Sequence, residues 1–96
     1  MSKSNSQERI CEIIEILCKS FPRALKTKEL AAMLKTLEVN VSRDIAILEK
    51  FDFVSKNENG IRLSKKFARM SEEMKKGYDT AIAKLEQDKK EFFSGE

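Results

Sequence analysis

Two short apolar-periodic segments lie only a few residues apart in the centre of the chain, and their spacing constrains the fold more than any other feature. Helical spacing joins Leu30, Ala31 and Leu34, and then Val41, Ile45 and Leu48. The sequence therefore predicts a helix over about residues 28–35, with Thr27 as its cap, and another over 39–50. Residues 36–38 are left for a tight turn, so the two helices must pack against each other.

A β-hairpin is predicted directly after these helices. Phe53-Val54-Ser55 and Ile61-Arg62-Leu63 have the composition of short strands, and Asn59-Gly60 lies between them. Both turn residues tolerate a positive φ, so we expect a type I′ turn there. A helix, a tight turn, a second helix and a hairpin form a layout that is typical of a DNA-reading module.

An N-terminal helix is predicted from Ser6, which can cap it, to Phe21-Pro22, because a residue before proline avoids the helical region. Its apolar positions are Ile10, Ile13, Ile14 and Leu17. Residues 24–26 are expected to form a short extended piece before the central helices.

Cys11 and Cys18 lie seven residues apart on this helix, about 10 Å, which is beyond disulfide reach. They share a face with Ile14 and Leu17, so we expect two buried thiols that act as small hydrophobes. A redox-sensing pair across a dimer is the alternative. The chain has no histidine, which argues against a zinc site.

A long helix is predicted over 65–93, with Ser64 as its cap and a length of about 40 Å. Its first half, with Phe67, Met70 and Met74, is expected to cover the core. The remaining apolar stripe needs a partner, most simply the same helix of a second copy, unless the helix folds back on residues 10–17 to leave a monomer. The predicted dimer contacts are Met74, Tyr78, Ala81, Ile82, Leu85 and Phe92.

The sequence therefore predicts a mainly α chain with a small β-hairpin. We assign residues 1–66 to one domain and residues 67–96 to a C-terminal helix that covers its core or mediates dimerisation. A chain of 96 residues has the size of one small domain.

Basic residues are concentrated in the centre of the chain. Residues 21–66 carry ten Lys and Arg against six Asp and Glu, whereas residues 1–20 balance at three of each and 67–96 carry six against seven. This asymmetry is what a local phosphate-facing patch requires, although a solvated basic face would look the same.

Several classes of function are disfavoured by composition. With no histidine, no glycine-rich phosphate loop and no nucleophile beside a plausible base, we expect no enzyme, metal, cofactor or small-molecule effector. No stretch approaches the length of apolar sequence that spans a bilayer, so no membrane partner is expected. Residues 1–7 lack the apolar run of a signal peptide, and we expect a cytoplasmic protein.

Residues 27–63 resemble a bacterial winged helix-turn-helix. The segment from Val41-Ser42-Arg43-Asp44 to Glu49 is similar to the N-terminal domain of DeoR-type repressors, where Arg-Asp-Leu-x-x-Leu-Glu is typical. Leu30-Ala31 and Phe53-Val54 match that pattern as well, and IclR-type and MarR-type regulators are looser relatives. The resemblance implies a winged helix-turn-helix fold extended by the long C-terminal helix.

Three features depart from that family. Lys35 stands where glycine usually makes the turn, at a cost of about 1–2 kcal/mol for the left-handed conformation, which would allow a wider turn. Asp52 stands where glycine usually follows the second helix, and aspartate tolerates that geometry. The family's effector domain is missing, which favours a minimal regulator of the kind found in phages and mobile elements.

The resemblance implies that the second central helix enters the major groove. Arg43 would then contact guanine or phosphate, Asn40 adenine, and Ser42 either base or phosphate. Alternatively, Arg43 pairs with Glu38 or another surface acid, and the hairpin cations are merely solvated. The predicted DNA-contacting residues are Lys28, Val39, Asn40, Ser42, Arg43, Lys50, Lys56, Arg62, Lys65 and Lys66.

We therefore expect a sequence-specific binder of double-stranded DNA, a small homodimeric transcriptional regulator such as a repressor. The alternative is a winged-helix adaptor that binds another protein and no DNA.

Overall fold

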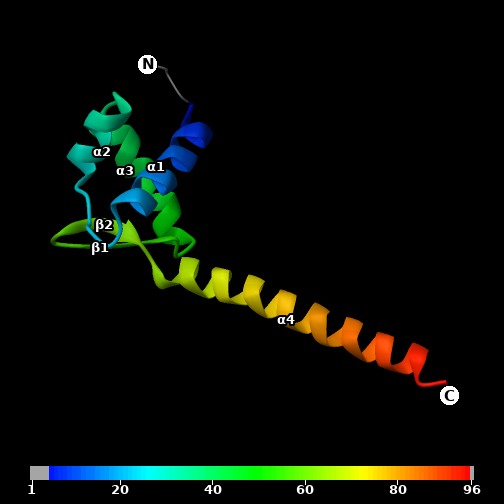
Figure 1. Cartoon of the computed structure of the whole chain (residues 1–96). Helices are drawn as coiled ribbons and strands as arrows, with labels where there is room; N and C mark the ends of the chain where they lie inside the picture. Colours follow the sequence, from blue (N-terminus) through cyan, green and yellow to red (C-terminus); the bar gives the residue numbers. More distant parts are fainter. Residues whose placement is uncertain (1–4, 96) are drawn as a thin grey trace.

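The computed structural model describes residues 5–95, which form a compact head and one projecting helix (Figure 1). The head, residues 5–64, holds three helices and a two-stranded hairpin, and the molecule measures 68 × 29 × 21 Å. Within residues 5–95, no helix combines the length and apolarity that a bilayer crossing requires. The prediction that residues 1–7 form no signal peptide falls partly on residues 1–4, which lie outside the described residues. The elements are α1 (Ser6–Ser20), α2 (Thr27–Leu34), α3 (Glu38–Lys50), β1 (Val54–Asn57), β2 (Gly60–Leu63) and α4 (Lys65–Phe93).

Helix α1 begins one residue earlier than its predicted cap allows. Asn5, not Ser6, is the N-cap: its side chain accepts a hydrogen bond from the Glu8 backbone N–H at 2.8 Å, and the Glu8 carboxylate accepts one from the Asn5 N–H at 3.4 Å. This reciprocal capping box satisfies two free amides instead of one. The helix ends before Phe21-Pro22, as predicted.

The thiols of α1 are exposed, so the prediction that they are buried is wrong. The face of α1 that enters the core is centred on Ile13 and Leu17, both with no exposed surface. Cys11 and Cys18 lie roughly 100–160° around the helix from these residues, given 100° per residue. The isoleucines on both sides of this face are half-buried. The apolar residues of α1 therefore cover a wider part of the helix surface than the part that is fully buried.

Helices α2 and α3 match their predicted ranges to within one residue. The cap of α2 is Lys26 and not Thr27, because the Glu29 carboxylate accepts the Lys26 backbone N–H at 2.8 Å. Lys35 ends α2 in the left-handed conformation, φ 54° and ψ 48°, which glycine would take at no steric cost. The Thr36 N–H donates to the Ala31 carbonyl at 3.0 Å and closes the helix end.

The core of the head lies between the three helices and the hairpin (Figure 1). All predicted inward residues of the central helices are buried except Leu34, which is half-buried. The buried apolar residues are Ile13, Leu17, Leu25, Leu30, Ala31, Val41, Ile45, Leu48, Val54, Ile61 and Leu63.

The hairpin forms where predicted, but its turn differs. The strands pair antiparallel with Asn57 opposite Gly60, so Glu58 and Asn59 are the loop residues. Asn59 does not have a positive φ, whereas Gly60 does at 127°, so the type I′ prediction is wrong. Leu25, in the predicted extended piece, exchanges two backbone hydrogen bonds of 2.8 and 2.9 Å with Ile61 and extends the hairpin on its other edge.

Helix α4 leaves the head and does not cover its core. Of its apolar residues only Phe67 packs against the head, with its ring centroid 5.3 Å from that of Phe53. Met70 and Met74, predicted to be core residues, are 42% and 71% exposed. No residue of Lys65–Phe93 is buried, and the helix does not fold back on α1 (Figure 1). Ser64 caps it as predicted.

Candidate nucleic-acid interface

Helix α3 has one buried and one exposed face. Val41, Asp44, Ile45 and Leu48 follow helical spacing and are all buried in the head. The opposite face is open to solvent along the whole helix. We call the exposed residues of this face the α3 ridge: Val39, Ser42, Arg43, Ala46, Ile47 and Lys50.

The side chain of Arg43 is unengaged at the centre of the ridge. Within residues 5–95 it forms no ion pair or side-chain hydrogen bond, so the alternative pairing with Glu38 does not occur. Lys50 lies two turns further along the same face, with its ammonium 5.9 Å from the Phe51 ring centroid. Two cations about 10 Å apart along one exposed helix face can each reach a separate acceptor.

Asn40 is less available than the sequence suggested. It is half-buried, and its Nδ2 donates to the Thr36 hydroxyl at 2.9 Å. The contact holds the first turn of α3 to the preceding connection. Asn40 could bind a base only by giving up or sharing this hydrogen bond, because its amide has two N–H donors.

Asp44 is the one buried charged residue in the described chain, 1% exposed. Arg9 of α1 donates to it through Nε at 2.5 Å and Nη2 at 3.2 Å (a bidentate pair). The carboxylate accepting these bonds raises the pKa of Arg9 above its ordinary value. The ion pair attaches α1 to the buried side of α3, so it fixes the orientation of the ridge from behind.

The burial of Asp44 was not predicted from the sequence. Helical spacing places Asp44 on the same stripe as Val41, Ile45 and Leu48, and this spacing could have predicted that its side chain is buried. Nothing local in the sequence marks Arg9 as the partner, because the two residues are 35 positions apart.

The basic residues of the hairpin differ in whether their side chains contact other parts of the head. Lys56 on β1 is exposed. Arg62 on β2 donates to the Pro22 carbonyl at 3.1 Å, and its guanidinium lies 5.5 Å from the Phe21 ring centroid. Arg62 therefore links the hairpin to the α1–α2 connection. Near the turn, Lys26 Nζ donates to the Glu58 carbonyl at 2.6 Å, a contact that the sequence did not suggest.

The cations at the start of α4 also differ. Lys66 donates through Nζ to the Phe51 carbonyl at 2.8 Å, and its ammonium is 4.5 Å from the Phe53 ring centroid. It thus ties α4 to the end of α3, where a cation also stabilises exposed carbonyls. Lys65, its neighbour, is exposed and takes part in neither contact.

Lys28 is the second residue of α2, and its side chain is exposed. Beside it, the Glu29 carboxylate accepts the Lys26 N–H and pairs with Arg23 at 2.9 Å. The backbone hydrogen bond, with the nearby cations, lowers the pKa of Glu29. The negative charge at this helix start partly offsets what Lys28 offers to an anion.

Comparison with known protein-family models and with curated proteins finds no match to this chain. Within residues 5–95, no three Cys, Asp or Glu side chains gather in a way that could hold a metal ion.

Proposed function

We propose that this protein binds double-stranded DNA and that α3 is its reading helix. The observation that carries the proposal is the solvent-exposed α3 ridge, with Arg43 unpaired at its centre and the opposite face of the helix fixed in the core. Helix α3 spans 13 residues, about 20 Å, and an α-helix fits the major groove of B-DNA.

The arrangement around α3 supports assignment of residues 27–63 as a winged helix-turn-helix. Helix α2 ends on Lys35 in the left-handed conformation that this motif ordinarily gives to glycine. Asp52, with φ 64°, takes the same conformation after α3. A two-stranded hairpin follows at once, in the place of a wing. The sequence resemblance and the backbone geometry therefore agree at the two positions, Lys35 and Asp52, where the family ordinarily has glycine.

The role proposed for each basic residue depends on whether its side chain already contacts another part of the head. Arg43 and Lys50 lie on the ridge, so Arg43 would read a base edge or clamp a phosphate, and Lys50 would contact the backbone. Lys28, Lys56 and Lys65 are exposed and would contact phosphates, which position a protein without reading sequence. Arg62 and Lys66 are already engaged within the head and would contribute mainly by shaping the hairpin and the base of α4.

Binding is tested by fluorescence anisotropy on duplexes obtained by binding-site selection. We expect the logarithm of the affinity to fall linearly with the logarithm of salt concentration. Arg43→Ala should weaken binding to the selected site by about 1–3 kcal/mol and relax its sequence preference. The matched control is Lys76→Ala, which removes an exposed cation from α4, outside the head, and should leave affinity nearly unchanged.

The second candidate is a protein-binding adaptor. The apolar residues exposed on and beside the ridge favour it: Leu37 is 69%, Val39 51% and Ile47 47% exposed. These side chains could also contact thymine methyl groups, so they do not decide between the two functions. If no selected duplex binds with salt-sensitive affinity, or if Arg43→Ala and Lys76→Ala behave alike, the adaptor becomes the better explanation.

A further inference from the structure

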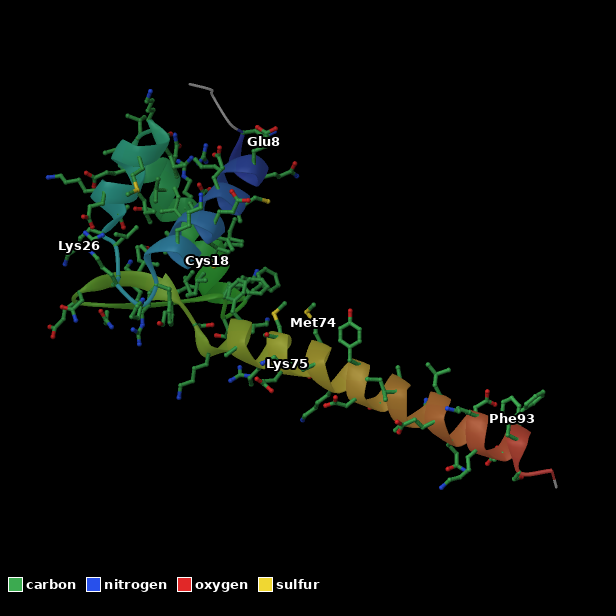
Figure 2. All side chains as sticks on the ribbon, viewed as in Figure 1. Glu8, Cys18, Lys26, Met74, Lys75 and Phe93 are labelled. Carbon is green, nitrogen blue, oxygen red and sulfur yellow. The ribbon has the colours of Figure 1, made fainter. Side chains whose placement is uncertain are left out.

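Beyond Phe67, helix α4 carries an apolar stripe that nothing in the described chain covers. Tyr78 is 74% exposed, Leu85 67% and Phe92 78%, although all are large side chains. Figure 2 shows Met74 and Phe93 projecting from the same side of the helix, the side toward which the head lies. A solvated helix of 29 residues does not retain such a stripe for its own stability, so the stripe marks a contact surface.

The stripe has the spacing of a two-stranded coiled coil. Residues alternate at four and three positions without interruption, which gives the 3.5-residue period of left-handed supercoils. Only two of the eight positions are polar, Ser71 and Asp88. We call these eight residues the α4 seam: Phe67, Ser71, Met74, Tyr78, Ala81, Leu85, Asp88 and Phe92.

We propose that the α4 seam pairs with the α4 seam of a second copy of this chain, and that the two helices run antiparallel. A parallel pair in register would place Asp88 against Asp88 of the second copy inside the seam. It would also bring Lys84 beside Lys89 of the second copy, because parallel coiled coils juxtapose flanking positions five residues apart. Both of these contacts bring like charges together, so they oppose the parallel arrangement of the two helices.

The antiparallel pair removes both conflicts in one register. With its centre between Tyr78 and Ala81, every seam residue finds a seam partner, and the two polar residues meet each other. At the centre of the seam a large side chain then faces a smaller or flexible one, and at each end two phenylalanines face each other. The pairs across the two copies are Tyr78 with Ala81, Met74 with Leu85, Ser71 with Asp88, and Phe67 with Phe92.

Neighbouring registers are poorer. A slip of seven residues in one direction places Asp88 against Tyr78 and leaves Phe67 without a seam partner. A slip in the other direction leaves both Asp88 and Phe92 beyond the end of the facing seam. In the centred register Phe92 of the second copy also meets Phe67 beside Phe53, where α4 joins the head.

Disulfide trapping tests orientation and register together. Cys11 and Cys18 are exposed and are first replaced by Ser, and Met74→Cys and Leu85→Cys are then made in separate chains. We expect neither chain to form a disulfide dimer alone, and the exchanged mixture to form one. After trypsin cleavage, the link should join the peptide of residues 70–75 to that of residues 85–89. A dimer of either variant alone would mean parallel helices and would overturn the proposal.

Solution mass provides the second arm. The full chain should have twice its monomer mass by light scattering in the absence of DNA, so this result is independent of the proposed DNA binding. Leu85→Asp should be a monomer, whereas Ala83→Asp, a matched change on the opposite face of α4, should stay a dimer. A full chain that stays monomeric across a wide range of concentrations, or a dimer that Leu85→Asp leaves intact, would refute the pairing.

Discussion

Gly60 lies where the backbone of Leu25 leaves no room for a side chain. A Cβ atom at this position would stand 2.6 Å from the Leu25 carbonyl oxygen, and φ is 127°. Gly60→Ala should therefore destabilise the head by about 2–5 kcal/mol, which combines overpacking and backbone strain. Urea unfolding followed by circular dichroism would measure the loss as a lower midpoint with an unchanged slope.

Gly77 supplies the matched control for this substitution. It lies in α4, where a Cβ atom would have nothing within 4 Å of it, so Gly77→Ala should cause no loss and add up to about 1 kcal/mol of local helix stability. Equal unfolding midpoints for Gly60→Ala and the unchanged protein would show that Leu25 can move away.

The same residue illustrates what sequence could and could not predict. Asn59-Gly60 correctly predicted a hairpin, because the pair is common at such turns. The reason for the glycine is different: it allows the close approach of Leu25, 35 residues away. A contact over that separation leaves no local pattern. Lys35 and Asp52 could be predicted as left-handed positions only because the family resemblance assigned glycine to them.

At the scale of elements, α1 is fixed to α3 by the buried pair of Arg9 and Asp44. Arg9→Met would leave a buried carboxylate without its partner and should cost about 3–5 kcal/mol of unfolding free energy. Combining it with Asp44→Leu should recover most of that loss, since two apolar side chains can pack where the ion pair was. Urea unfolding of the two single variants and the double variant forms a complete cycle.

An exposed ion pair serves as the comparison. Arg23 and Glu29 are 64% and 41% exposed at their side chains and 2.9 Å apart. Arg23→Met should therefore change stability by less than about 1 kcal/mol. If Arg9→Met proved equally mild, water would have to reach Asp44 in the folded head.

The boundaries of the helices were predicted well, but the face of α1 that is buried in the core was not. Periodicity places α2 and α3 to within one residue, because few residues in them can point inward. In α1 the apolar arc is wide, and the core takes the part around Ile13 and Leu17 that excludes Cys11 and Cys18. Periodicity measures which residues share a face, whereas burial depends on what packs against that face.

At the scale of the whole molecule, α4 shows the same limit. Its stripe was correctly located in the sequence, but its first half was assigned to the core of the head. The head is already closed by its hairpin and by Leu25, so only Phe67 finds a place on it. For the candidate interface, the sequence identified the exposed face of α3, whereas it could not tell that Asn40, Arg62 and Lys66 are held by other parts of the head.

Together, the two proposals predict how the intact molecule would engage DNA. In the antiparallel pair the heads lie at opposite ends of an overlap of about 37 Å, given 1.5 Å per residue. The two α3 ridges lie beyond the ends of this overlap, so they are held apart by at least one turn of DNA, roughly 34–36 Å, and both heads could bind half-sites of one duplex (Figure 1). Linked binding of this kind raises affinity by about 10²–10⁴ over a single head.

Leu85→Asp should therefore lose about 10²-fold or more in affinity for a duplex that carries two half-sites at the spacing found by binding-site selection. Its affinity for a duplex with one half-site should be unchanged, because the α3 ridge lies outside the seam. Ala83→Asp should bind both duplexes like the unchanged protein. Fluorescence anisotropy at one fixed salt concentration makes the comparison. Equal affinity of Leu85→Asp and Ala83→Asp for the two-site duplex would mean that the heads act singly, even if α4 pairs as proposed.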